Sequence, residues 1–156
     1  MNISNLYAIR IKNIFSVHYY EFSLNYQYSG ESHNYWEIVY VDKGNVKITS
    51  DDETFYLKEG EMYFHQPNEF HSIGGDGKIA SNVFIISFDC NSKNMNFYKK
   101  RMVRIFPDYN HYINKIINIS KETYKAVEEK FAAWKNEADQ VTETTPTPEQ
   151  TVTDTI

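Results

Sequence analysis

The chain has 156 residues, of which 41% are hydrophobic, 24% charged and 16% aromatic, a composition that predicts one globular domain and excludes two full-sized ones. The formal net charge is −5, and five of the 21 acidic residues follow Asn136, where no Lys or Arg occurs. The other 16 acidic residues (21 minus 5) balance 16 Lys and Arg, which excludes a basic footprint for nucleic acid. We therefore expect that this chain alone does not bind DNA.

The cysteine content and the N-terminus bear on the compartment. Cys90 is the single cysteine, so no internal disulfide can form, and a reducing, cytoplasmic location is expected. Residues 1–12 contain neither a long apolar run nor a small-residue cleavage site, so we expect no secretory signal there. No stretch approaches the roughly 20 apolar residues of a membrane helix, so no membrane association is expected.

The first half of the chain consists of short runs rich in β-branched and aromatic residues, separated by turn signals such as residues 42–44 and 74–77. Regular short strands with frequent turns indicate an antiparallel sandwich or barrel rather than a parallel α/β sheet. The predicted strands cover residues 17–22, 36–41, 46–49, 54–57, 61–64 and 82–88.

Helical patterns follow. A short helix is expected over residues 94–103, and a longer one from Asp108, as N-cap after Pro107, to about Trp134. The longer helix either packs on its own barrel or pairs with a second copy as a dimerisation helix, and a wide apolar stripe could do both. The stripe recurs at spacings of four and three residues and comprises Ile113, Ile117, Ser120, Tyr124, Val127, Phe131 and Trp134.

Two segments carry the most informative residues: residues 31–44, with the sequence ESHNYWEIVYVDKG, and residues 60–71, with the sequence GEMYFHQPNEFH. They resemble the paired motifs of cupins. The phrases HNYWEIVYVDKG, PNEFH and FIISF resemble, more narrowly, the N-terminal sensor domain of AraC-family transcription regulators. The residues that fit the two cupin motifs are His33, Glu37 and Gly44 in the first segment and Gly60, Pro67 and His71 in the second.

This resemblance implies a mainly β fold: a cupin double-stranded β-helix (jelly-roll) barrel followed by one or two C-terminal α-helices. The implied organisation is a sensor barrel over residues 1–92 and a helical dimerisation segment over residues 93–137. The Thr-, Pro- and Glu-rich residues 138–156 are expected to be a disordered tail, because they cannot bury enough apolar surface to offset ordering. We expect no counterpart of the family's helix-turn-helix DNA-binding domain within these residues.

Side chains of like parity on one strand share a face, so Glu31, His33 and Glu37 are expected to enter one barrel mouth, where His71 joins them. In metal-binding cupins the corresponding set is three His and one Glu, and Glu31 stands here in place of the first His, which weakens the case for catalysis. Under the alternative interpretation these four residues hold a divalent transition metal in a small cupin enzyme of isomerase or dioxygenase type.

Under the leading interpretation the chain is the effector-binding and dimerisation domain of an AraC-like regulator, with no enzymatic activity and no cofactor. The effector is a small molecule, and a sugar is one candidate because aromatic faces suit its C–H groups. A homodimer through the helix over residues 108–134 is expected. The predicted ligand-binding residues are His33, Tyr35, Glu37, Tyr26, Trp36 and His71, with Tyr28 nearby.

Structural roles compete with each of these assignments. His33 could hydrogen-bond a carboxylate at the rim, Glu37 could pair with a lysine, and His71 could close a turn. His65 is expected in a loop. A third interpretation is a dimeric interaction module that binds no ligand.

Overall fold

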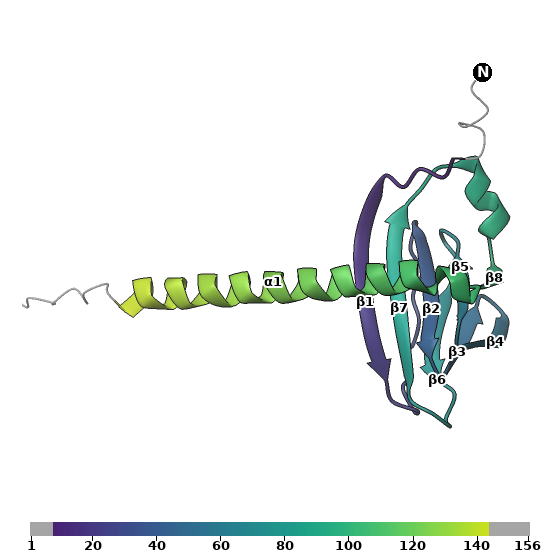
Figure 1. Ribbon diagram of the computed structural model, residues 1–156, viewed down its shortest axis with the longest axis horizontal. Coiled ribbons are helices and arrows are strands. Elements are labelled where there is room, and N and C mark those ends of the chain that lie inside the picture. Colours follow the sequence, from purple (N-terminus) through teal and green to yellow (C-terminus); the bar gives the residue numbers. More distant parts are fainter. Residues whose placement is uncertain (1–7, 144–156) are drawn as a thin grey trace, which may run out of the picture. The chain divides into compact units, whose positions relative to one another are not determined.

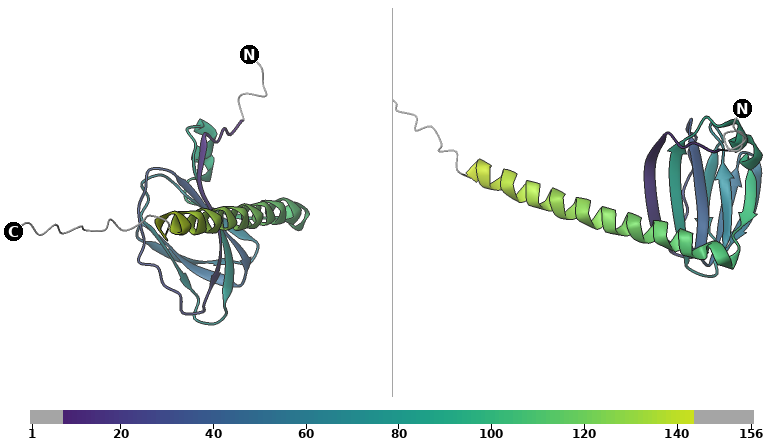
Figure 2. Two further views of the ribbon diagram at one scale, coloured as in Figure 1. Left: turned by 90° about the vertical axis from the view of Figure 1, so that its left-hand side faces the viewer. Right: turned by 45° about the horizontal axis from the view of Figure 1, so that its top comes forward.

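The computed structural model describes residues 8–143, and its contacts divide the chain into two compact units, one up to Ser120 and one from Lys121 onward. The first unit contains two antiparallel sheets, which face each other in Figures 1 and 2. The five-stranded sheet has the order β1-β7-β2-β5-β8, and the three-stranded sheet has the order β4-β3-β6. The strands are β1 (Asn13–Phe22), β2 (Trp36–Lys43), β3 (Asn45–Ser50), β4 (Glu53–Lys58), β5 (Glu61–His65), β6 (His71–Gly75), β7 (Ser81–Asp89) and β8 (Arg101–Arg104). The mainly β, cupin-type fold expected from the sequence is therefore confirmed.

The main core lies between the sheets and follows strand alternation. In β3, for example, Val46 and Ile48 are buried while Lys47 between them is exposed. This inner cluster comprises Phe22, Val39, Val41, Val46, Ile48, Leu57, Tyr63, Ile73, Val83 and Ile85.

A second cluster covers the other face of the five-stranded sheet, because β2 and β7 are buried on both faces. Their near-continuous apolar sequences reflect this double burial. The outer cluster comprises Trp36, Tyr40, Met62, Phe64, Phe84, Phe88, Cys90, Met95 and Ile117.

Two elements differ from the sequence prediction. The expected helix over residues 94–103 is wrong: a 3-10 helix, η2 (Lys93–Tyr98), precedes β8, where Val103 pairs with Met62 of β5. Strand β6 was missed because Gly74 and Gly75 read as a turn. A Cβ atom on Gly74 would lie 2.9 Å from the Gln27 side chain, so glycine permits residues 24–27 to approach β6.

The long helix α1 (Asn110–Glu143) follows a 3-10 turn, η3 (Pro107–Tyr109). Asp108 is not its N-cap but lies inside η3, and its backbone oxygen accepts a hydrogen bond from His111 Nδ1 at 2.8 Å. The helix also continues past residue 138, where the tail was expected to begin. The tail predicted beyond Glu143 lies outside the described residues. None of the described helices combines the length and apolarity that crossing a bilayer requires.

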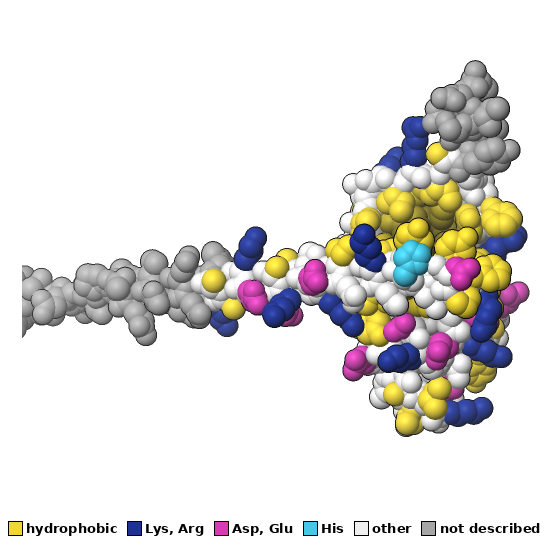
Figure 3. Space-filling model, viewed as in Figure 1, with side chains coloured by type: hydrophobic (Ala, Val, Ile, Leu, Met, Phe, Trp, Pro, Cys, Tyr) yellow, Lys and Arg dark blue, Asp and Glu magenta, His cyan; other side chains and the backbone are white. Residues whose placement is uncertain are grey.

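The apolar stripe of α1 divides at Ser120. Within the first unit, Ile117 is only 4% exposed and packs in the outer cluster. In the second unit, Tyr124, Val127 and Phe131 are 42%, 58% and 62% exposed. Figure 3 shows hydrophobic and charged side chains interleaved along this part of the helix. The stripe therefore covers the barrel at one end and is open to solvent further along.

Candidate functional site

Four acidic and imidazole side chains converge at the barrel mouth: the ligand atoms of Glu31, His33, Glu37 and His71 all lie within 4.8 Å of one another. These four residues were expected from the sequence, but the backbone arrangement that brings them together was not. Glu37 belongs to β2, whereas residues 32–35 form no strand, so the shared-strand parity does not apply to Glu31 and His33. The convergence depends on pairing with β6 instead.

Backbone contacts hold the segment before β2 against β6. Glu31 and His71 exchange two backbone hydrogen bonds of 2.9 Å, and the Asn68 amide donates to the His33 carbonyl at 2.6 Å. Gly30 has φ +100°, and a Cβ atom there would lie 2.8 Å from the His71 carbonyl oxygen. A residue with a side chain would therefore push Glu31 away from His71.

The two histidines present the same ring nitrogen to the site. His33 Nδ1 lies 3.1 Å from the Tyr35 carbonyl oxygen, and His71 Nδ1 lies 3.1 Å from that of Glu69. A carbonyl oxygen only accepts, so each Nδ1 carries a proton and Nε2 is the nitrogen that each ring turns toward the site. Both Nε2 atoms are buried without a hydrogen-bond partner among the described residues. Each Nε2 instead faces the carboxylate of Glu37.

Glu37 lies between these rings. Its carboxylate oxygens are 3.6 Å from His33 Nε2 and 3.4 Å from His71 Nε2, and Ser87 Oγ donates to it at 2.9 Å. Burial alone would raise the pKa of Glu37, but these three neighbours together hold it well below the usual range. The pKa of His71 is raised, because the adjacent Glu37 outweighs the opposing effect of burial. The partners of Glu37 are thus histidine and serine, not the lysine considered from the sequence, and His71 opens β6 rather than closing a turn.

A buried network behind His71 was not anticipated. His65 lies in β5, not in a loop, and its Nδ1 is 2.7 Å from Glu69 Oε1, which also accepts from Ser50 Oγ at 2.6 Å. The His65 ring stacks on His71 with centroids 4.3 Å apart. Two sequence signals would have revealed this network. Tyr63 and His65 share a strand face, and Glu69 follows His65 by four residues across the Pro-Asn turn.

Three of the converged side chains, those of Glu31, Glu37 and His71, form the floor of a pocket of about 270 Å³. Aromatic rings form its walls: Phe22 stacks on Tyr26 with centroids 4.0 Å apart, and Tyr20 stacks on Phe22 at 5.5 Å. The lining residues are Tyr20, Phe22, Tyr26, Tyr28, Glu31, Glu37, His71 and Ile85. We refer to this cavity as the mouth pocket.

The sequence comparison identifies the family that this barrel resembles. Residues 17–92 match the family of AraC-like ligand binding domains. The match covers part of β1 and all of β2 to β7, and it includes every residue that lines the mouth pocket. No curated protein matches the chain in sequence.

Several solved cupin structures resemble the fold. The Cnp3 cupin domain of Schizosaccharomyces pombe is 16% identical, with a TM-score of 0.47 over 57% of this chain and 63% of that one. A cupin protein from Bacteroides fragilis is 20% identical, with a TM-score of 0.46 over 49% and 66% of the two chains. A predicted oxalate decarboxylase from Thermotoga maritima is 17% identical, with a TM-score of 0.46 over 48% and 66%. The chain spans less than two thirds of the length of each of these three.

Three of the six predicted ligand-binding residues, His33, Tyr35 and Trp36, lie outside the lining of the mouth pocket. Tyr35 stacks on His33, with centroids 3.7 Å apart, and so supports that ring from behind. Trp36 points to the opposite face of β2 from Glu37, packs in the outer cluster, and donates its Nε1–H to the Cys90 carbonyl at 3.2 Å. The prediction that Trp36 lines the pocket is therefore wrong. Tyr20 and Phe22, alternate residues of β1, line it instead.

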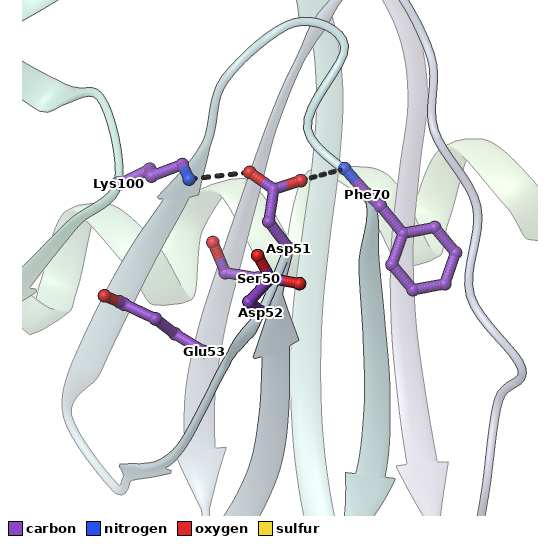
Figure 4. A pocket seen from close by; sticks show the side chains of 6 residues that line it. All are labelled: Ser50, Asp51, Asp52, Glu53, Phe70 and Lys100. Carbon is purple, nitrogen blue, oxygen red and sulfur yellow. Dashed lines mark hydrogen bonds and ion pairs between the residues drawn. The ribbon is translucent and has the colours of Figure 1, made fainter.

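A larger but more open hollow, of about 610 Å³, lies beside the β3–β4 turn. The negative charge of its acidic lining is partly compensated by neighbouring groups of the protein, as Figure 4 shows. Asp51 forms a 2.6 Å ion pair with Lys100 and accepts a 3.0 Å hydrogen bond from the Phe70 amide. The mouth pocket instead includes Glu31, Glu37 and His71, three of the four converged side chains, and is therefore the better candidate site.

Proposed function

We propose that this chain is the effector-binding and dimerisation part of an AraC-like transcription regulator, and that the mouth pocket receives the effector. The main support for this proposal is that the residues matched to AraC-like ligand binding domains form a barrel with a pocket of aromatic walls and a polar floor. Such a pocket, concave and largely apolar with a few convergent polar groups, has the usual character of a small-molecule site. In this proposal a separate domain binds DNA, in keeping with the balanced charge of the body of the chain.

The second part of the proposal concerns α1. Ile117 and Ser120 are buried in the first unit, so among the described side chains of the stripe we assign the seam with a second copy to the exposed Tyr124, Val127 and Phe131. They follow the 3-4 spacing by which paired helices interlock. A dimer through this part of the helix would couple two effector pockets within one regulator.

A thermal-shift screen tests the effector site. A ligand that binds only the folded state raises its stability by RT ln(1 + [L]/Kd). We expect one or more compounds of a small-molecule panel, sugars included, to raise the melting temperature of the wild-type chain and to lose that effect in Glu37→Gln. Stabilisation of both proteins alike, or of neither, would contradict the proposal.

The same four residues support a second candidate function, a metal-dependent cupin enzyme. Two imidazole nitrogens and two carboxylates suit a first-row divalent metal, and each histidine already donates its other N–H to a carbonyl, as metal-bound histidines usually do. In that case Glu31, His33, Glu37 and His71 would hold the ion, which would supply Lewis-acid or redox chemistry when bound.

Elemental mass spectrometry of the purified chain, before and after mild chelation, separates the two functions. One transition metal per chain that is lost in Glu37→Gln or His71→Ala would favour the enzyme. A metal content well below one per chain, together with ligand-dependent stability, would favour the sensor. Tight dimerisation without metal or ligand would favour an interaction module.

A further inference from the structure

The floor of the mouth pocket is acidic. Glu31 and Glu37 both line the pocket and bring two carboxylates to it. The Nε2 atoms of His33 and His71 are buried and face Glu37 at 3.6 and 3.4 Å. Because an ionised carboxylate only accepts hydrogen bonds, a ligand that reaches this floor must bring donors.

The aromatic walls of the pocket favour a cationic ligand. Tyr20 and Tyr28 stand at the rim, 40% and 38% exposed, and Phe22 and Tyr26 stack deeper in the pocket. Aromatic faces attract cations through their quadrupoles, more strongly where water is excluded. None of the described residues that line the pocket is Lys or Arg, whereas two are Glu. An anionic ligand would meet carboxylates without a compensating cationic side chain from Lys or Arg.

We propose that the mouth pocket selects a protonated amine carried on an apolar or aromatic body. The ammonium would donate to the carboxylates of Glu31 and Glu37, and the body would pack between Tyr20, Phe22 and Tyr28. This inference rests on the proposed effector site and names the chemical class of its ligand.

Three probes of similar shape and different charge test the proposal: phenethylamine, phenylethanol and phenylacetate. Isothermal titration calorimetry on the full chain, with a chelator present to exclude metals, gives their affinities. We expect phenethylamine to bind about tenfold or more tightly than phenylethanol, and phenylacetate not to bind measurably. Equal affinities of the amine and the alcohol, or preference for phenylacetate, would overturn the inference.

Matched variants locate the effect. Glu37→Gln should weaken amine binding about tenfold or more, and Glu31→Gln, at an exposed position, about two- to fivefold. Glu53→Gln removes the same charge from the surface and should change nothing. Loss of affinity in Glu53→Gln equal to that in Glu31→Gln would mean only a general charge effect and would overturn the inference.

The outcome also separates this inference from the function on which it depends. A sugar that binds in a Glu37-dependent manner while all amines fail would overturn the amine class and leave the effector site intact. Failure of sugars, amines and anions together would contradict the effector site itself.

Discussion

Glu69 offers a quantitative test of how the site is supported. Its side chain is fully buried and accepts three hydrogen bonds: from Ser50 Oγ at 2.6 Å, from His65 Nδ1 at 2.7 Å and from the Gln66 amide at 3.1 Å. In Glu69→Gln the amide oxygen can still accept from Ser50 and His65, but its NH₂ group then faces the Gln66 N–H. Hydrogen bonds to a charged group contribute about 1.5–3 kcal/mol each, and an unsatisfied buried donor costs about 1–3 kcal/mol.

We therefore expect Glu69→Gln to lower the free energy of unfolding by about 2–4 kcal/mol. Urea denaturation followed by tryptophan fluorescence measures this change, with the exposed Glu53→Gln as the control. With a slope of about 2 kcal/mol per molar urea, the midpoint should fall by roughly 1–2 M. A loss below about 0.5 kcal/mol, the range of ordinary surface substitutions, would refute the network as described.

The pH dependence of the same comparison has a defined direction. Burial alone would raise the pKa of Glu69, but the hydrogen bonds from His65 and Ser50 lower it. A lowered pKa stabilises the folded state above the unfolded value of about 4.3, and that contribution is lost as the pH falls through the folded value. The stability difference between wild type and Glu69→Gln should be full at pH 7 and shrink below about pH 4. A difference that grows on acidification would contradict the assignment.

Three further predictions concern the dimer, the backbone and the outer cluster. Val127→Glu should convert a dimer into a monomer in sedimentation velocity while the far-ultraviolet circular dichroism of the barrel stays unchanged; unfolding instead would show that this part of the helix is needed for the fold. Gly30→Ala should reduce the urea midpoint more than Gly60→Ala, because both positions have positive φ but only Gly30 lacks room for a Cβ atom; equal losses would remove the steric argument. Trp36→Phe should cost about 1–3 kcal/mol of stability and leave ligand affinity intact, and a selective loss of affinity would return Trp36 to the pocket.

The sequence predicts most of the barrel because its strands satisfy local rules. The expected strands over residues 46–49 and 54–57 each fall one residue short of β3 and β4 at either end, since alternation and the Asp-Asp turn mark them clearly. Residues 101–104 form a strand although their composition favoured the predicted helix. Their extended form depends on pairing with the edge of β5. Tertiary pairing overrides local propensity there.

The site was predictable in its chemistry but not in its orientation. Glu37 and His71 follow from the paired motifs, and the structure brings them together with Glu31 and His33. Trp36 was misplaced because β2 is buried on both faces, so its sequence does not show which face borders the cavity. The tautomers of the two histidines depend on backbone carbonyls that no sequence pattern reveals.

The most direct test of the central claim, that the barrel mouth is the ligand site, is an amide chemical-shift titration of the isotope-labelled chain. The titrant is the compound that stabilises the chain most in the thermal-shift screen. We predict the largest shifts at Tyr28, Glu31 and His71, around the mouth pocket, with saturation at one ligand per chain. Shifts centred instead on Asp51 and Phe70 at the β3–β4 hollow, or spread without saturation, would contradict the account.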